Sequence, residues 1–235
     1  MNELSLFTGI GGGLLGSKLL GWRTIGYVEI DEYCQRVIGR RIADGVLDSA
    51  PIFGCVNKFL ESGAAGEYRG FADVVTAGFP CQPFSVAGRR EGERDDRNMW
   101  PQTIEVIRRV RPRYAFLENV PGLLADKYFG RILGDLAESG YNAKWKVISA
   151  AEMGATHLRD RIWIVAHASS EGRDEKNIAE KRQIARSAWW NSEPDVGRLA
   201  YGAPDDVERL KALGNAQVPA VAACAWEILS AETRF

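Results

Sequence analysis

The feature that most constrains the fold is a short apolar run, residues 3–7, that enters a glycine-rich turn, residues 8–13. Apolar residues then recur at helical spacing between residues 14 and 20. Glycine lets a backbone approach a ligand closely, and a helix that starts there presents free N–H groups to it. Strand, glycine turn and helix in this order predict the opening unit of a nucleotide-binding α/β sheet. Residues 11–16 also match GxGxxG, which is a weak signal by itself.

A length of 235 residues is enough for the core of one α/β domain with a small additional lobe, and 46% hydrophobic and 26% charged residues are typical of a globular protein. We find no signal peptide and no apolar run near the ~18 residues of a membrane helix, so we expect a cytoplasmic protein without a membrane partner. The four cysteines and two histidines lack metal-ligand spacing, which argues against a metal site or a disulfide framework. Lys and Arg total 30 against 31 Asp and Glu, so any nucleic-acid surface has to be local.

Further apolar runs predict a sheet that draws on most of the chain. Strand-like runs lie at residues 24–30, 51–56, 72–79, 114–117, 144–149 and 161–167, and helical spacing occurs at residues 34–42, 99–110, 131–139 and 219–231. The last two strand-like runs predict an antiparallel pair that closes the sheet. Residues 168–207 are polar and lack apolar periodicity. We therefore expect a main domain at 1–167, a small lobe at 168–207, and a segment at 208–235 that returns to the main domain.

Cys81 lies between two prolines, directly after the apolar run at 72–79. Ligands of open α/β sheets bind at the carboxyl ends of strands, so Cys81 is a candidate reactive group. The alternative is a small buried hydrophobe, the common role of a free cysteine. The arginine-rich residues 86–98 form either a plain solvated loop or a lid beside the site.

Glu29 ends the second strand-like run, where a carboxylate can bind both hydroxyls of a ribose. The alternative is a charge that favours the N-terminus of the next helix, which Asp31 and Glu32 also supply. We favour the ribose role, because the glycine turn precedes Glu29 at the appropriate distance.

Five motifs follow one another along the chain: FTGIGG, GFPCQPFS, ENV, HLRDRIW and ALGNAQVP. Together they resemble the cytosine-5 DNA methyltransferase family, over about residues 3–167 and 209–231. The resemblance implies a Rossmann-like α/β fold of the S-adenosyl-L-methionine-dependent methyltransferases, with a mixed, mostly parallel sheet flanked by helices and a reduced target-recognition lobe. It also implies methyl transfer to carbon 5 of cytosine in double-stranded DNA. The compact form resembles phage- and prophage-encoded members, which implies a bacterial or phage-infected cell.

The resemblance implies that Cys81 is the nucleophile, which adds to carbon 6 of a flipped-out cytosine and so makes carbon 5 nucleophilic. Glu118 would hold the base through N3 and the exocyclic amine, Arg161 would contact its O2, and Arg159 would support this geometry. Asn119 would brace the turn beside the substrate. Further contacts to the DNA are implied for Gln82, Ser85, Arg89, Arg90, Arg94 and Arg97.

The resemblance also implies a pocket for S-adenosyl-L-methionine. Its expected residues are Phe7, Gly9, Ile10, Gly11 and Gly12 at the methionine end, Glu29 at the ribose, Ile30 and Val56 at the adenine, Pro80, Asn215 and Ala216 as closing residues, and Trp100 against the edge. The family usually has an aspartate where this chain has Cys55. A thiol accepts hydrogen bonds weakly, so we expect weaker cofactor binding or another group in its place.

The expected lobe is short for a family member that reads a defined site. Its basic residues and the pair Trp189–Trp190 either contact DNA or form a solvated face with packing aromatics. The short lobe predicts that the protein recognises DNA weakly or through a short site. Otherwise a second copy, or another protein such as a cognate restriction enzyme, contributes to recognition. Three other functions stay open: a tRNA cytosine-5 methyltransferase, a catalytically silent cofactor-binding regulator, and a nicotinamide oxidoreductase, which leaves the Pro-Cys-Gln and Arg-x-Arg motifs unexplained.

Overall fold

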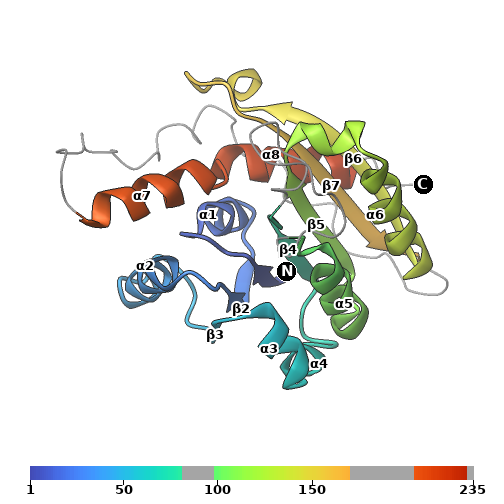
Figure 1. Cartoon of the computed structure of the whole chain (residues 1–235), viewed down its shortest axis with the longest axis horizontal. Helices are drawn as coiled ribbons and strands as arrows, with labels where there is room; N and C mark the ends of the chain where they lie inside the picture. Colours follow the sequence, from blue (N-terminus) through green and yellow to red (C-terminus); the bar gives the residue numbers. More distant parts are fainter. Residues whose placement is uncertain (81–97, 170–203, 232–235) are drawn as a thin grey trace.

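A seven-stranded sheet runs through the computed structural model, which describes residues 1–80, 98–169 and 204–231 (Figure 1). The strand order is β3-β2-β1-β4-β5-β7-β6. The strands are β1 (Asn2–Leu6), β2 (Arg23–Val28), β3 (Ile52–Phe53), β4 (Val74–Ala77), β5 (Tyr114–Asn119), β6 (Tyr141–Ser149) and β7 (Asp160–Ala168). β1 to β5 pair in parallel, whereas β7 is antiparallel to both β5 and β6. The mixed, mostly parallel sheet and its antiparallel closing pair are confirmed.

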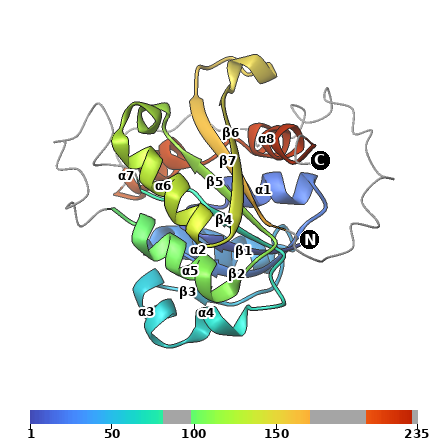
Figure 2. The same ribbon diagram turned by 90° about the vertical axis from the view of Figure 1, so that its right-hand side faces the viewer.

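Helices pack on both faces of this sheet (Figures 1 and 2). They are α1 (Gly12–Leu19), α2 (Glu32–Ala43), α3 (Val56–Glu61), α4 (Ala64–Glu67), α5 (Trp100–Val110), α6 (Lys127–Glu138), α7 (Pro204–Asn215) and α8 (Pro219–Ala231), with short 3-10 turns at Pro121–Ala125 and Ala151–Met153. Successive strand residues point to opposite faces. Val75 therefore belongs to the core cluster that contains Ile107 of α5, while Val74 belongs to the cluster that contains Val221 of α8. Both faces of the central strands are buried, which explains their continuous apolar runs.

Two helices begin at aspartates whose side chains cap them. The Asp31 carboxylate accepts from the N–H of Cys34 at 3.0 Å at the start of α2, and that of Asp126 accepts from the N–H of Tyr128 at 2.8 Å at the start of α6. An N-cap bond of this kind satisfies one of the backbone donors that a helix leaves unpaired. The two caps fix where α2 leaves the end of β2 and where α6 begins after β5.

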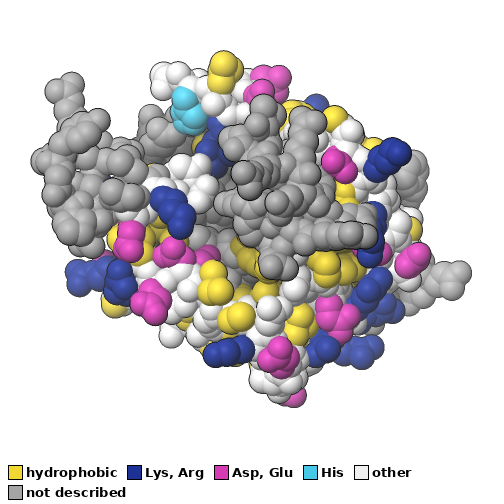
Figure 3. Space-filling view, viewed as in Figure 1, with side chains coloured by type: hydrophobic (Ala, Val, Ile, Leu, Met, Phe, Trp, Pro, Cys, Tyr) yellow, Lys and Arg dark blue, Asp and Glu magenta, His cyan; other side chains and the backbone are white. Residues whose placement is uncertain are grey.

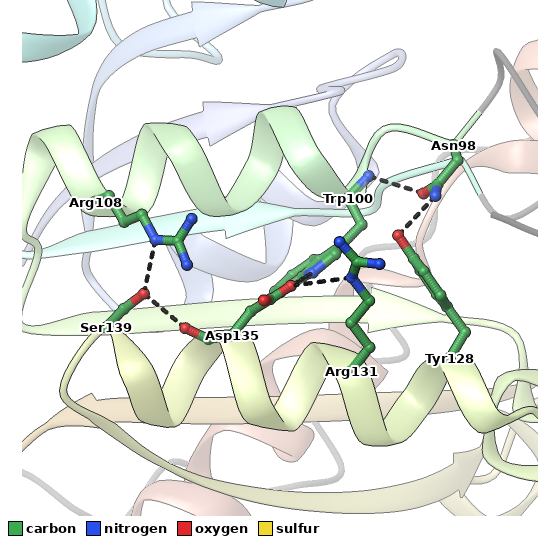
Figure 4. A network of polar contacts seen from close by, with 7 residues as sticks. All are labelled: Asn98, Trp100, Arg108, Tyr128, Arg131, Asp135 and Ser139. Atoms are coloured by element: carbon green, nitrogen blue, oxygen red, sulfur yellow. Dashed lines mark hydrogen bonds and ion pairs between the residues drawn. The ribbon is translucent and has the colours of Figure 1, made fainter. Parts of the chain in front are cut away.

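A polar network joins α5 to α6 (Figure 4). The indole N–H of Trp100 donates to the Asp135 carboxylate at 2.7 Å, and the Asn98 amide donates to the Tyr128 hydroxyl at 2.6 Å. The Trp100 side chain is fully buried, and its ring centroid lies 5.4 Å from that of Phe79. Trp100 begins an amphipathic helix, and its ring lies in the core that this helix shares with the sheet. The expected contact of Trp100 with the edge of the cofactor stays a prediction.

Other expected elements differ from those observed. Residues 51–56 were expected as a strand, but only Ile52–Phe53 pairs with β2, and Val56 begins α3. The short helices α3 and α4, and the helix α7, were not expected. Because α7 begins at Pro204, the expected boundary at 207/208 falls inside a helix. The rest of the expected lobe, from residue 170 to 203, lies outside the described residues.

Among the described residues, no helix combines the length and the apolar character that crossing a membrane requires.

Candidate active site

The ends of five strands meet at one edge of the sheet. β1, β2, β4 and β5 are parallel, so their carboxyl ends lie on the same side. β7 runs the other way, so its first residues lie beside the end of β5, with Glu118 opposite Trp163 and Asn119 opposite Ile162. The chain order reverses between β1 and β4. In open α/β sheets such a reversal opens a crevice at the carboxyl ends of the strands, where ligands bind.

The glycine turn after β1 has a tightly defined backbone. Gly9 and Gly11 have φ angles of +57° and +88°, and Phe7 has φ +52° although it carries a side chain. Side chains rarely adopt this left-handed region, so the two glycines are required by the turn, and Phe7 is strained at a site where ligands bind. The Thr8 N–H donates to the Val28 carbonyl at 3.3 Å, which ties the turn to the end of β2.

Glu29 lies against this turn, and 7% of its surface is exposed. Its two carboxylate oxygens accept the N–H groups of Gly9 at 2.6 Å and of Asp31 at 2.8 Å. The Asp31 side chain caps α2, so it supplies the helix N-terminal charge that was the alternative role for Glu29. A carboxylate can accept about four hydrogen bonds, so Glu29 retains acceptor capacity for two hydroxyls.

Gly12 and Gly13 lie directly against Gln217 and have no space for a side chain of their own. A Cβ atom at Gly12 would lie 2.3 Å from the carbonyl oxygen of Gln217, and one at Gly13 would lie 2.2 Å from the side-chain oxygen of Gln217. At Gly16 a Cβ atom would lie 2.7 Å from the Pro219 carbonyl oxygen. The sequence analysis expected these glycines to allow a ligand to approach the backbone closely. At Gly12, Gly13 and Gly16 it is instead the segment leading into α8 that approaches the backbone closely. A cofactor contact at Gly12 stays a prediction.

Glu118 and Arg161 form an ion pair at the end of β5, with 2.8 Å between the Arg161 Nε and the Glu118 Oε1. The Gln217 amide donates to the other carboxylate oxygen, Oε2, at 3.4 Å. Burial raises the pKa of the Glu118 carboxyl, because only 11% of its side chain is exposed, and the charge of Arg161, the bond from Gln217 and the charge of Arg159 oppose that rise. Such a carboxyl is suited to sharing a proton with a ligand near neutral pH.

Arg159 connects this pair to α7. Its Nη1 donates to the carbonyl of Gly214 at 2.8 Å, in the last turn of the helix, where a cation is favoured by the helix dipole. Burial is the main cause that lowers the Arg159 pKa, and the neighbouring Arg161 adds to it, while Glu118 opposes it. Arg159 keeps its charge, because a guanidinium does not deprotonate in proteins. Its position agrees with a supporting role for the geometry of Glu118 and Arg161.

A small cavity of about 10 Å³, with room for about one water molecule, lies behind Glu118. Glu118, Arg159, Arg161, Trp163 and Gln217 contribute to its lining, with Val218 and Val221 of the α8 segment. It is far too small for a nucleobase.

Asn119 links β5 to the turn after β4. Its buried side chain donates to the Phe79 carbonyl at 3.1 Å, two residues before Cys81, and accepts from the N–H of Val120 at 2.8 Å. This geometry agrees with the bracing role expected for Asn119, while a direct substrate contact stays a prediction. Cys81 itself, with Gln82, Ser85, Arg89, Arg90, Arg94 and Arg97, lies outside the described residues.

The other expected pocket residues surround the glycine turn and the end of β2. Ile30 is 71% exposed beside Glu29, whereas Ile10 is buried in a cluster with Cys34 and Ala212. Ala216 packs against the same cluster. The remaining residues are the exposed Pro80 after β4, Cys55 and Val56 at the start of α3, and Asn215 at the end of α7. The most important residue that the sequence analysis missed is Gln217, which contacts both Glu118 and the glycine turn.

The edge fits the cofactor expected from the sequence. The turn presents its backbone in a conformation that only glycine adopts easily, Glu29 keeps acceptor capacity for a ribose, and Ile30 offers an exposed apolar surface for a purine. Among the residues of the three described ranges, no group of three His, Cys, Asp or Glu side chains could hold a metal ion.

Charges on the molecular surface are interspersed. On the face shown in Figure 3, Lys and Arg side chains lie among Asp and Glu side chains. This agrees with the near balance of 30 basic and 31 acidic residues.

The fold and the site define a Rossmann-like protein of the S-adenosyl-L-methionine-dependent methyltransferase class. Residues 1–213 match the family model of the C-5 cytosine-specific DNA methylases, and the chain belongs to that family. The family and the fold confirm the cofactor class expected from the sequence.

Two curated relatives are 35% and 34% identical to the chain: the type II methyltransferase M.AplI of Arthrospira platensis over 166 residues, and M.NgoMIV of Neisseria gonorrhoeae over 168 residues. Each match covers 70% of this chain but only 45% and 51% of the relative, so the chain spans about half the length of the curated relatives it matches. The solved structure of the methyltransferase EhMeth of Entamoeba histolytica shares the fold with a TM-score of 0.58 and 18% identity, over 88% of this chain and 64% of that one.

Proposed function

We propose that this chain transfers a methyl group from S-adenosyl-L-methionine to carbon 5 of cytosine in double-stranded DNA. The observation that carries the proposal is the Glu118 carboxylate, held by Arg161 at the same sheet edge as the glycine turn and Glu29. Membership of the C-5 cytosine-specific DNA methylase family supports it. So do the relatives from Arthrospira platensis and Neisseria gonorrhoeae, which are type II methyltransferases.

Each described residue has a defined part in this reaction. When bound, S-adenosyl-L-methionine supplies a methyl group on a positively charged sulfur, which a carbon nucleophile can attack so that the sulfur leaves as a neutral thioether. Glu29 accepts from the ribose hydroxyls, and Ile30 covers the adenine. Glu118 accepts from the exocyclic amine of cytosine and shares a proton with N3, and Arg161 donates to O2. Together these contacts favour the charge that develops on the ring as a nucleophile adds.

Cys81 follows β4 by four residues, after the turn that Asn119 braces. Its thiolate adds to carbon 6 of a base that has been rotated out of the duplex, so carbon 5 becomes nucleophilic and takes the methyl group. The proton of carbon 5 then passes to water, the bond from sulfur to carbon 6 breaks, and the thiolate is released. Gln82, Ser85 and the arginines of residues 86–98 contact the flipped nucleotide and its phosphates.

Methyl transfer to duplex DNA, with transfer RNA as a parallel substrate, tests the proposal. We expect 5-methylcytosine in the duplex, read by methylation-sensitive sequencing, and permanent attachment of a duplex that contains 5-fluorocytosine to Cys81. Methylated adenine, or transfer to RNA alone, would contradict the proposal.

Glu118→Gln is the sharpest variant, because it keeps the shape of the side chain and removes the shared proton. We expect the rate of methyl transfer to fall by about 10²–10⁴-fold, the range for removing a general acid or base. Glu105→Gln makes the same change on the outer surface of α5, where Glu105 pairs with Arg109, and should leave the rate unchanged. Equal rates for Glu118→Gln and the wild type would refute the role of Glu118.

A further inference from the structure

Gln217 lies where three parts of the sheet edge meet. It belongs to the segment between α7 and α8, and its side chain approaches the glycine turn, the turn after β4 and the end of β5. A Cβ atom at Gly78, three residues before Cys81, would lie 3.0 Å from both the Gln217 Nε2 and the Glu118 Oε2. Gly13 and Gly78 thus leave space for one carboxamide, and that carboxamide contacts Glu118.

The two oxygens of Glu118 have different donors. Arg161 of β7 holds Oε1 at 2.8 Å, and the Gln217 amide holds Oε2 at 3.4 Å. Either bond alone leaves the carboxylate free to rotate about its last torsion, which has a broad energy minimum. With a donor on each oxygen, the plane of the carboxylate is set, and so are the lone pairs that face a ligand.

We propose that Gln217 is a positioning residue of the active site, which orients the Glu118 carboxylate toward the cytosine and keeps it in register with the glycine turn. This role rests on the proposed function. Gln217 acts through Glu118 and does not itself contact the reacting atoms. The amide is suited to this place because it offers a donor to Glu118 while its oxygen faces Gly13, without adding a second charge to a buried pair.

The charged groups around Glu118 in the described residues are Arg161 and Arg159, both of which favour its ionised form. The N–H of Gln217 favours the same form. Gln217→Met keeps the length of the side chain and removes this donor. The Glu118 carboxyl should then titrate at a higher pH than in the wild type, because its anion has lost one hydrogen bond while its burial is unchanged.

The test follows the carboxyl carbon of Glu118 by NMR across a pH series in the free protein, with the signal identified by its loss in Glu118→Gln. Gln102→Met on α5 is the matched control, since it makes the same chemical change in a side chain that is not among the groups acting on the Glu118 carboxyl. We expect an upward shift of the Glu118 titration in Gln217→Met and none in Gln102→Met. Identical Glu118 titration curves in Gln217→Met and the wild type would overturn the proposal.

Activity gives a second readout. The pH profile of methyl transfer by Gln217→Met should move in the same direction as the titration, with a rate about tenfold lower at neutral pH, as for a lost hydrogen bond to a charged group. The NMR titration of Glu118 requires no turnover, so it tests the contact with Gln217 independently of activity. If the wild type fails to methylate DNA, the proposed function is refuted, but the effect of Gln217 on Glu118 is still measured. Should Gln217→Met fail to fold, Gln217→Asn withdraws the donor from Oε2 and is titrated with the same two outcomes.

Discussion

Cys55 is the N-cap residue of its helix, a position that an aspartate occupies in two other helices of the chain. It precedes α3 in an extended conformation, and its side chain makes no capping bond. Asp31 and Asp126 make such bonds at the starts of α2 and α6. The family resemblance predicts an aspartate here, which would accept from the adenine amine. One residue therefore bears on both helix stability and cofactor affinity.

Replacing Cys55 with Asp should improve both properties. We expect the free energy of unfolding to rise by about 1 kcal/mol, the usual effect of an N-cap, and S-adenosyl-L-methionine to bind more tightly because a carboxylate accepts better than a thiol. Cys55→Ser is the matched control, since it caps the helix without adding a charge. Thermal unfolding and calorimetry separate the two effects. A gain in stability without a gain in affinity would show that Cys55 is remote from the adenine.

At the scale of secondary structure, the sequence predicted elements best where burial is continuous. The runs that became β4 and β5 are apolar on both faces, and α5 and α8 have well-defined ends. The run at 51–56 was misassigned because β3 is an edge strand that pairs with β2 at only two positions, Tyr27 with Ile52 and Val28 with Phe53. The helices α3 and α4 have only six and four residues, too few for periodicity to identify them.

The close contact of Gly12 in α1 with the segment before α8 gives a prediction that Gly39 in α2 controls. Gly12→Ala should destabilise the protein by about 1–3 kcal/mol, because its Cβ atom would lie 2.3 Å from a backbone oxygen of Gln217, which cannot move aside like a side chain. Gly39→Ala in α2 should stabilise it by about 0.4–1 kcal/mol, because no atom lies within 4 Å and alanine favours the helix. Urea unfolding of both variants measures the contrast. Similar changes in both would refute the close packing at Gly12.

For the whole molecule, the assembly of the site could be predicted only in part. Strand ends at one edge of a sheet place Glu29 and Glu118 on the same side, and the motifs point to Arg159 and Arg161. The contact of Gln217 with Glu118 joins residues 99 positions apart, and no local pattern reveals such a pair. A polar amide directly before the apolar start of α8 was the available signal. The burial of Trp100 in the core was not predicted either, because its partners Phe79 and Asp135 lie 21 and 35 positions away and leave no local pattern.

Glu3 is a buried carboxyl that the proposed reaction does not use, and its ionisation makes the stability of the folded protein depend on pH. Glu3 in β1 is 1% exposed, and it accepts hydroxyl hydrogen bonds from Ser17 at 3.0 Å, Thr24 at 3.1 Å and Thr76 at 2.7 Å. Burial raises the pKa of Glu3 above its ordinary value of 4.5, and these three bonds oppose the rise without cancelling it, while Asp48 adds to it.

Because the folded state holds the proton of Glu3 more tightly than the unfolded state, the stability from this group is complete below about pH 4.5 and is lost as the pH rises through the folded pKa. Within that window the slope approaches about 1.4 kcal/mol per pH unit. Glu3→Gln keeps the shape and cannot ionise, and the three hydroxyls can turn to accept from its amide. The variant should therefore gain stability relative to the wild type as the pH rises. Urea unfolding of both proteins between about pH 5 and about pH 9 measures this difference. Glu105→Gln, at a half-exposed position, is the control for the exchange of a carboxylate for an amide. A Glu3→Gln curve parallel to that of the wild type would show that Glu3 is ionised in the folded protein throughout this range.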